Sequence, residues 1–457
     1  MPGVDGGDPS AAPAADTIAA VATPPGRGGI GVVRMSGQKA PEIAQRVLGT
    51  LPAPRRASLR TARDARGAAI DQGIALYFPA PHSYTGEPVL EFQGHGGPVV
   101  LQDVLAAFLD SGARLAAPGE FTQRAYLNGR IDLAQAESVA DLIDAASREA
   151  ARSAMRSLCG EFSRAIHALL ASLTELRALT EAMLDFPEEE VDALHRDDAH
   201  ARLARVRALL AEVVAKSRQG SLLRTGINVV LAGRPNVGKS SLLNRLAGEE
   251  RAIVTPVPGT TRDALRESIQ IEGVPINLVD TAGLRDARDE LERLGIERAR
   301  TELDRADVVL VVFDASVGVL PEDRLVLALL PRDSHRIHVY NKIDLEPAGV
   351  PVALGEEAPE VRVSAKTGAG LDALRLALLQ AAGWQVHGEG VYLARERHLR
   401  ALARAQGHLG AAAAIAERWE FFAEELRAAQ AALSDITGEF TADELLGEIF
   451  ARFCIGK

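Results

Sequence analysis

The apolar residues of this chain follow two patterns that alternate along its length. Short apolar runs bounded by Gly, Pro and polar residues predict strands at residues 18–22, 29–34, 72–78, 89–93, 227–232, 276–279, 337–340 and 361–363. Apolar spacing of three and four residues predicts helices at residues 41–48, 99–111, 133–143, 166–179, 241–246 and 392–433. A segment of mixed strands and helices therefore occurs twice, and a segment with helical spacing alone follows it each time.

These changes in the apolar pattern divide the chain into predicted domains. We expect a disordered tail over residues 1–15, an α/β domain over 16–129, a first helical half over 130–219, a second α/β domain over 220–382 and a second helical half over 383–457. Because a whole α/β domain separates the helical halves, we expect one discontinuous helical bundle with that domain inserted. The predicted fold class is multidomain, α/β plus α. The acidic run Glu188 to Glu190 is interpreted as a helix start favoured by the helix dipole, and not as a metal site.

The strand at 227–232 leads into Gly233-Arg234-Pro235-Asn236-Val237-Gly238-Lys239-Ser240. A G-x-x-x-x-G-K-S pattern between a strand and a helix is typical of a phosphate-binding loop. The glycines let backbone N–H groups face a triphosphate, Lys239 places a charge on its β and γ phosphates, and Ser240 offers a hydroxyl to Mg²⁺.

Three later motifs occur in the order that a GTPase requires. They are Asp280-Thr281-Ala282-Gly283, Asn341-Lys342-Ile343-Asp344 and Ser364-Ala365-Lys366. Asp344 can accept two N–H bonds from a guanine ring, a donor pattern that adenine lacks, so we expect GTP as the nucleotide. Together these motifs resemble the P-loop GTPase domain of translation-factor-like (Ras-like) GTPases, which implies a mostly parallel sheet with helices on both faces.

Composition narrows the class of protein. The chain has 457 residues, too many for one ordinary core, and its 47% hydrophobic and 25% charged residues are typical of a globular protein. No apolar run is long enough to span a membrane and no signal-peptide pattern opens the chain, so we expect a cytoplasmic protein without membrane contact. Cys159 and Cys454 are too few for a disulfide framework. The net charge of −11 argues against a broad non-specific nucleic-acid surface.

Four segments of the first α/β domain carry a closer resemblance, namely Thr23 to Gly31, Ser83 to Glu87, Gly94 to Gly97 and Pro118 to Thr122. With the GTPase motifs and the ending Cys454-Ile455-Gly456-Lys457, they resemble the tRNA modification GTPase family MnmE, also called TrmE, over about residues 16–457. The resemblance implies that the first domain forms a homodimer. It also implies that this domain binds a reduced folate, either 5,10-methylenetetrahydrofolate or 5-formyltetrahydrofolate.

By position in the family, the folate contacts fall on Arg34, Glu91, Arg130 and Lys457. At position 130 the family often has Lys, and Arg keeps the charge but changes its geometry. For Cys454 two interpretations stay open. It is a small apolar residue packed near the terminus, or a nucleophilic or redox residue beside the folate.

The residues after Gly283 bear on hydrolysis. Leu284 stands where Ras-type GTPases have a Gln that orients the attacking water, and leucine cannot replace it. The polar candidates downstream are Arg285, Asp286, Asp289, Glu290 and Glu292. The resemblance points to Glu292 as the catalytic residue.

The resemblance also implies a K⁺ ion held by Asn236, Thr255, Val257 and Thr260, which takes the role of an arginine finger by countering charge in the transition state. Mg²⁺ is expected at Ser240 and Thr261. The full set of expected GTP contacts is Asn236, Val237, Gly238, Lys239, Ser240, Ser241, Thr255, Pro256, Val257, Pro258, Gly259, Thr260, Thr261, Asp280, Thr281, Ala282, Gly283, Asn341, Lys342, Asp344, Ser364, Ala365 and Lys366.

As a function, the resemblance implies a potassium-dependent GTPase that forms a heterotetramer with the FAD-dependent partner MnmG. This complex adds a 5-carboxymethylaminomethyl or aminomethyl group to the wobble uridine of certain tRNAs, with the carbon taken from folate. Two alternatives stay open. A ribosome-assembly or RNA-binding GTPase would carry a basic appendage after Lys366. A free-standing folate aminomethyltransferase would turn over folate without a flavin partner.

Overall fold

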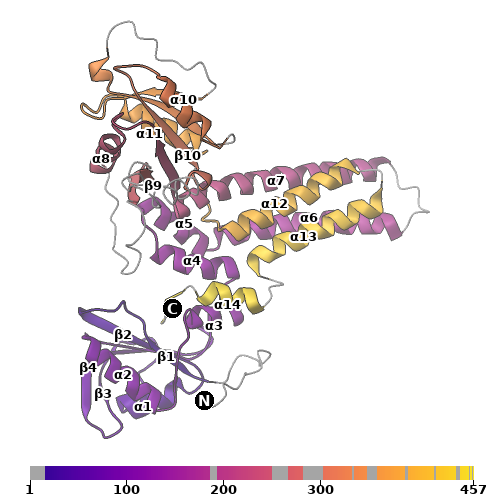
Figure 1. Cartoon of the computed structure of the whole chain (residues 1–457). Coiled ribbons are helices and arrows are strands. Elements are labelled where there is room, and N and C mark those ends of the chain that lie inside the picture. Colours follow the sequence, from indigo (N-terminus) through magenta and orange to yellow (C-terminus); the bar gives the residue numbers. More distant parts are fainter. Residues whose placement is uncertain are drawn as a thin grey trace, which may run out of the picture. The chain divides into compact units, whose positions relative to one another are not determined.

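The computed structural model divides into two compact units (Figure 1). The first combines Met1–Ala140 with Ser434–Lys457, and the second is Asp141–Leu433. The structure describes residues 16–185, 193–249, 266–280, 302–331, 334–346, 358–385, 390–415, 418–438, 443–451, 453, 454 and 456. The predicted tail and the run Glu188 to Glu190 lie outside these residues. No helix within them is both long and apolar enough to cross a membrane.

The first unit is built on a six-stranded sheet with the order β3-β4-β5-β2-β1-β6. Its strands are β1 (Ile18–Val21), β2 (Gly28–Ser36), β3 (Ser58–Arg63), β4 (Ala69–Phe78), β5 (Val89–Gly96) and β6 (Arg114–Leu115). All neighbours pair antiparallel except β1 and β6. Alternate residues such as Val33, Ala75 and Phe92 are buried in a core with helices α1 (Ala40–Leu48) and α2 (Pro98–Asp110). The residues between them, including the paired Arg34 and Glu91, therefore point to the opposite face of the sheet.

The end of the chain packs into this first unit. Helix α3 (Glu120–Leu127) follows the sheet, and α4 (Leu133–Ile143) shares an apolar cluster with α14 (Asp443–Ala451) and with Phe453. Gly119 has φ of 67°, and a Cβ there would contact the Phe450 carbonyl oxygen at 2.8 Å. A Cβ on Gly456 would collide with the Val21 carbonyl oxygen. Both glycines are therefore needed for this close approach.

The second unit contains a sheet with the order β12-β11-β10-β7-β9-β8. Its strands are β7 (Ile227–Ala232), β8 (Arg266–Ile271), β9 (Val274–Asp280), β10 (Val308–Asp314), β11 (Arg336–Asn341) and β12 (Glu360–Arg362). Every pair is parallel except β8 with β9. Helices α8 (Lys239–Glu249), α10 (Pro321–Ala328) and α11 (Leu371–Ala381) belong to this α/β part, with a 3₁₀ turn at Ile343–Leu345. The central strands read as continuous apolar runs because both faces of the sheet are covered.

Long helices form the bundle in the described part of the second unit (Figure 1). Two precede the parallel sheet in the chain and two follow it, namely α6 (Glu161–Asp185), α7 (Ala193–Thr225), α12 (Glu396–Ala414) and α13 (Trp419–Thr437). Arg177 of α6 bonds Gln430 of α13, and His408 of α12 pairs with Glu425 of α13. The discontinuous bundle with an inserted α/β domain is thus confirmed.

The insertion leaves and re-enters the bundle next to α5 (Arg148–Leu158). Helix α7 leads into β7 with only Gly226 between them. On the return, the Val391 carbonyl accepts a hydrogen bond from Ser153 Oγ at 2.9 Å, and the Leu393 N–H donates to Ser157 Oγ at 3.2 Å. A Cβ on Gly220 of α7 would collide with the Tyr392 carbonyl, so the outgoing and returning segments lie in contact.

The eight predicted strands and the predicted helices at 41–48, 99–111, 133–143, 166–179 and 241–246 are confirmed as elements, with shifted bounds. The predicted helical run 392–433 is two helices, α12 and α13, and the first of them begins only at Glu396. The sequence interpretation missed β3, β6, β8 and β10. β3 is a polar edge strand without clear alternation, whereas β10 is an apolar run that carried a usable signal. The domain boundaries at 129, 219 and 382 stay predictions. All elements described after Lys366 are helices, so the basic KH-like or OB-like appendage of the ribosome-assembly alternative, which would contain strands, has no counterpart among them.

Candidate functional site

The loop of residues 233–240 joins β7 to α8 in the conformation of a phosphate cradle. Its backbone has positive φ at Gly233 (148°), Asn236 (65°) and Gly238 (95°). Such angles favour glycine and, near 65°, tolerate asparagine. A Cβ at Gly238 would also collide with the side-chain amide of Asn341. Glycine at position 238 is therefore required by its φ and by a neighbouring side chain.

Lys239 is the first residue of α8, and its side chain folds over this loop. The residue is 6% exposed, and its Nζ donates to the carbonyls of Gly233 and Arg234, both at 2.8 Å. The ammonium is thus held beside the N-terminus of α8, where the helix dipole adds positive potential. A fixed cation at a helix N-terminus is suited to an anion such as a triphosphate.

The Asn341-Lys342 pair at the end of β11 holds the loop from the other side. Asn341 Nδ2 donates to the Val237 carbonyl at 2.9 Å, and Lys342 Nζ donates to the Asn236 carbonyl at 2.7 Å. Lys342 Nζ also lies 2.6 Å from Asp314 Oδ2 at the end of β10. The motif that was predicted for base recognition therefore also fixes the shape of the phosphate loop.

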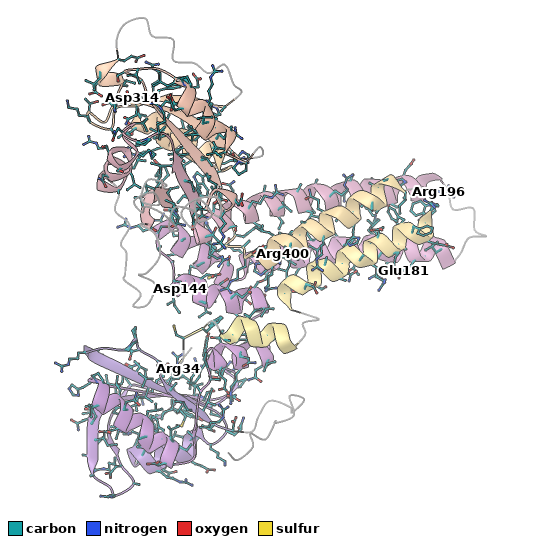
Figure 2. All side chains as sticks on the ribbon, viewed as in Figure 1. Arg34, Asp144, Glu181, Arg196, Asp314 and Arg400 are labelled. Atoms are coloured by element: carbon teal, nitrogen blue, oxygen red, sulfur yellow. The ribbon has the colours of Figure 1, made fainter. Side chains whose placement is uncertain are left out.

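Asp314, labelled in Figure 2, ends the central strand β10. Burial alone would raise its carboxyl pKa, but hydrogen bonds from Lys342 and Ser316 and the Lys342 charge hold that pKa below its ordinary value. The carboxylate therefore stays ionised, and it keeps Lys342 in position under the loop.

The residues predicted to recognise the base are also brought together. Ser364 Oγ bonds Asp344 Oδ1 at 2.6 Å and accepts from the Thr367 N–H at 3.1 Å. The Ala365 N–H donates to Asn341 Oδ1 at 3.0 Å. Asp344 is exposed, and its Oδ2 makes no hydrogen bond to any described residue, so this oxygen is open to a donor of a bound base. Lys366 is exposed on the same turn.

Several predicted residues lie outside the described part of the chain. These are Thr255, Pro256, Val257, Pro258, Gly259, Thr260, Thr261, Thr281, Ala282, Gly283, Leu284, Glu292 and Lys457. The backbone of Asp280 ends β9 and pairs with Leu231, which places it at the same sheet edge as the phosphate loop. Ser240 and Ser241 are exposed in the first turn of α8.

A second charged site lies on the face of the first unit's sheet that is opposite α1 and α2. Arg34, labelled in Figure 2, is the cross-strand partner of Glu91, and its Nε and NH2 atoms both lie 2.9 Å from Glu91 Oε1. The guanidinium carbon is 5.7 Å from the ring centre of Tyr84 and 5.8 Å from that of Phe121. Arg34 NH1 lies 3.5 Å from the Gly456 carbonyl oxygen. The Gly456 carbonyl, near the end of the chain, thus contacts the cation of a site that also contains a carboxylate and two aromatic rings.

Burial shapes this second site. Arg34 is 25% exposed and Glu91 is 17% exposed, so both remain partly open to a ligand. Burial raises the pKa of the Tyr84 hydroxyl, which bonds Thr122 Oγ1 at 2.8 Å. The arrangement offers an acceptor, a cation and aromatic faces, as an aromatic heterocycle with N–H donors requires.

Two other predicted residues of this region are less constrained. Arg130 is exposed, and its side-chain carbons lie beside Gly86, where a Cβ would be 3.4 Å away. Cys454 is exposed, whereas a small apolar residue packed near the terminus would be buried. The Cys454 carbonyl lies 3.4 Å from the Gly119 N–H.

Sequence reasoning missed a partly buried ionic network in the first unit, in which Arg124 is 8% exposed and Arg114 is 47% exposed. Arg124 bonds Asp16, Glu87 and Glu120 at distances of 2.7 to 3.2 Å, and Arg114 also pairs with Asp16 and Glu120. Burial would raise the Glu120 pKa, but hydrogen bonds from Arg114, the Ala117 N–H and Arg124 hold it below its ordinary value. The partners come from distant segments, and the sequence marked only Glu87 and Glu120 among them, through the family segments Ser83 to Glu87 and Pro118 to Thr122.

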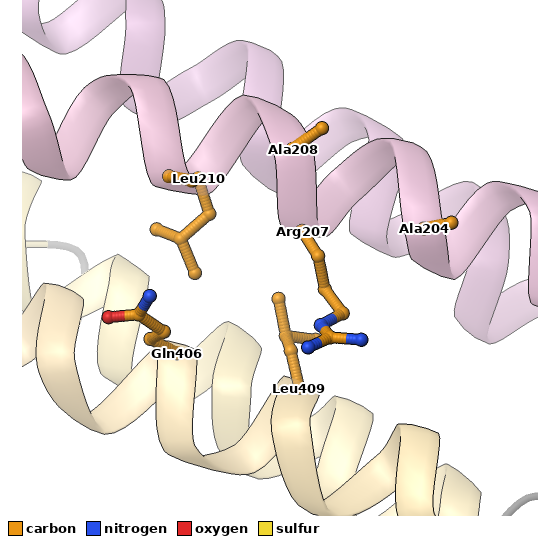
Figure 3. A pocket seen from close by; sticks show the side chains of 7 residues that line it. Ala204, Arg207, Ala208, Leu210, Gln406 and Leu409 are labelled. Atoms are coloured by element: carbon orange, nitrogen blue, oxygen red, sulfur yellow. The ribbon is translucent and has the colours of Figure 1, made fainter.

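The helical bundle has a hollow of its own, with a volume of 320 Å³ (Figure 3). It lies between α7 and α12 and is lined by Ala204, Arg207, Ala208, Leu210, Ala211, Gln406 and Leu409. Leu210 and Leu409 point toward one another across it (Figure 3). It contains none of the predicted site residues and no carboxylate or nucleophile.

Comparisons with known proteins bear on the whole chain. The model of the "GTP-binding protein TrmE N-terminus" matches residues 17–130, and that of the "MnmE helical domain" matches residues 133–454. The tRNA modification GTPase MnmE of Nitrosospira multiformis is 58% identical over 97% of this chain and 99% of its own length. That of Azoarcus sp. BH72 is 60% identical over 97% of this chain and 98% of its own.

Among solved structures, a variant of Era from Aquifex aeolicus bound to GDP and AlF4⁻ is 31% identical. The match covers 40% of this chain and 66% of the length of the Era chain. Its TM-score of 0.28 is too low to bear on the overall fold. The family matches and relatives span nearly all of this chain, including both sites described above. The chain belongs to the MnmE family of tRNA modification GTPases.

Proposed function

We propose that this GTPase acts as a cytoplasmic homodimer that pairs with an FAD-dependent MnmG partner in a heterotetramer. Together they form the 5-carboxymethylaminomethyl or aminomethyl group at the wobble uridine of certain tRNAs, with a one-carbon unit from a reduced folate. GTP hydrolysis drives a conformational cycle. The observation that supports the nucleotide chemistry best is the phosphate loop held by Asn341 and Lys342.

Two cations complete the proposed nucleotide site. Ser240 and Thr261 hold Mg²⁺, which neutralises charge between the β and γ phosphates. Asn236, with Thr255, Val257 and Thr260, holds K⁺. In support, the side chain of Asn236 is exposed and makes no hydrogen bond to a described residue, so its amide oxygen is open to a cation. Glu292, to which the family resemblance points, orients the attacking water, a role that Leu284 cannot fill.

The first unit supplies the proposed folate site. Glu91 accepts from the amino-pyrimidine N–H groups, Arg34 with Tyr84 and Phe121 faces the rings, and Arg130 and Lys457 attract the carboxylates of the tail. The contact of Arg34 with the Gly456 carbonyl supports this assignment, since it brings the end of the chain to the same site. Cys454 is exposed nearby in the chain and is the candidate nucleophile.

The first experiment measures GTP hydrolysis against protein concentration in potassium chloride and in sodium chloride. Potassium stimulation that rises with protein concentration is expected, because the cation site is completed when GTPase domains pair. An Asn236→Ala variant should lose that stimulation, and a Lys216→Ala variant, which breaks a surface ion pair on α7, should keep it. Equal rates in both salts would remove potassium from the proposal.

The tRNA role requires a separate assay. The protein, MnmG with FAD, GTP, methylenetetrahydrofolate, ammonium or glycine as the source of the amino nitrogen, and unmodified tRNA are combined, and the wobble nucleoside is identified by mass spectrometry. Modification that depends on this protein is expected. Modification without it, or none with all components present, would refute the proposal.

A further inference from the structure

We infer that Arg234 is a positioning residue that ties the phosphate loop to the N-terminus of α10 and thereby sets the affinity of the loop for nucleotide. Arg234 is the second residue of the loop, and its Nε donates to Asp323 Oδ1 at 2.6 Å. The Arg234 side chain is 20% exposed and that of Asp323 is 1% exposed. A charge-assisted hydrogen bond with so little solvent around it is among the stronger polar contacts in a protein.

The carboxylate of Asp323 is itself fixed. Its Oδ2 accepts from the Leu320 N–H at 2.9 Å, which caps the first turn of α10. Asp323 therefore holds the helix start with one oxygen and the loop with the other. Arg234 thus reaches the N-terminus of α10, and the last turn of the same helix is held by Leu327 in an apolar cluster with residues of β10 and β11.

On the loop side, Arg234 has a second role. Its carbonyl oxygen accepts from Lys239 Nζ at 2.8 Å, so the same residue holds the phosphate-binding lysine by its backbone and α10 by its side chain. The other two tethers bond the carbonyls of Asn236 and Val237, in the later half of the loop. In the earlier half of the loop, the side chain that ties the loop to a described residue of another element is that of Arg234. Without it, the carbonyls that orient Lys239 lose a fixed support.

The test compares Arg234→Ala, Asp323→Asn and the double variant with the unchanged protein. Asparagine at 323 can still cap Leu320, so this variant removes the charge but spares the helix start. Each single change should raise the KM for GTP and the release rate of fluorescent GDP about tenfold, as loss of one charge-assisted bond implies. The kcat at saturating GTP should change by less than about twofold, because no group that touches the reacting atoms is removed.

The double variant distinguishes one shared bond from two independent effects. If the two residues act through one bond, it should be no weaker than either single variant. Arg234→Lys should recover most of the affinity, because an ammonium can still pair with Asp323. An Arg375→Ala variant, which breaks an ion pair with Asp372 on α11, is the control and should leave the KM unchanged. The inference is overturned if Arg234→Ala lowers only the melting temperature and leaves KM and GDP release unchanged, or if the single effects add.

Discussion

The two charged sites of this protein are assembled in opposite ways. The phosphate loop is a single run of eight residues whose backbone forms the cradle, and side chains from later strands hold it in place. The site around Arg34 has no such run, because Glu91, Tyr84, Phe121 and Gly456 reach it from separate parts of the chain. A site made by backbone leaves a motif in the sequence, and a site made by side chains on a sheet face leaves only scattered residues.

The largest effect expected is at the backbone-built site. Lys239→Ala should lower kcat/KM for GTP hydrolysis by about a thousandfold, since a preorganised cation on the transferring phosphoryl group is removed. Lys216→Ala removes an ammonium from a surface pair with Glu212 and should have no effect. Steady-state hydrolysis of both variants checks this. A similar loss in both would mean that total charge, and not the loop, governs the rate.

The next effect concerns choice of base. Asp344→Asn should reverse the preference between GTP and xanthosine triphosphate by about a hundredfold, because an amide donates where the carboxylate accepted. Competition binding with both nucleotides measures this. An unchanged preference would show that the exposed oxygen of Asp344 does not contact the base.

For the site built by side chains, single changes should have smaller effects, because several groups share the ligand. Arg34→Ala is expected to weaken folate binding about tenfold by equilibrium dialysis, from the loss of one cation and its contact with Tyr84 and Phe121. Arg46→Ala, an exposed arginine of α1 that bonds the Ser111 carbonyl, is the control. Unaltered binding in Arg34→Ala would move the folate site elsewhere.

These differences explain how much the sequence could predict. The motifs at 233–240, 341–344 and 364–366 fixed the GTPase domain, because each requires particular residue types at adjacent positions. Arg34 and Glu91 were found only through family resemblance, since opposite charges on two strands are common. The pair of Arg234 with Asp323 was not predicted, because 89 positions separate them and the helix that presents Asp323 follows a strand that was itself missed.

The smallest expected effect is a dependence of stability on pH in the first unit. The pKa of Glu120 is depressed in the folded state, so its contribution is present at neutral pH and is lost as the pH falls through that lowered pKa. Glu120→Gln should lower the melting temperature by roughly 5 °C at neutral pH, and less in acid. Melting curves across the acidic range check the sign. A difference that grows as the pH falls would contradict it.

The contact between Gly220 and Tyr392 has a consequence for modularity. The segment that leaves the bundle toward the GTPase sheet and the segment that returns from it touch each other at their base. A loop that closes on adjacent ends costs little to shorten, since closure entropy depends weakly on length. The GTPase part could thus be replaced by a few Gly and Ser residues that join α7 to α12. The shortened chain would then expose Ala150, Ala154 and Leu223, which are buried in the same apolar cluster as the GTPase sheet.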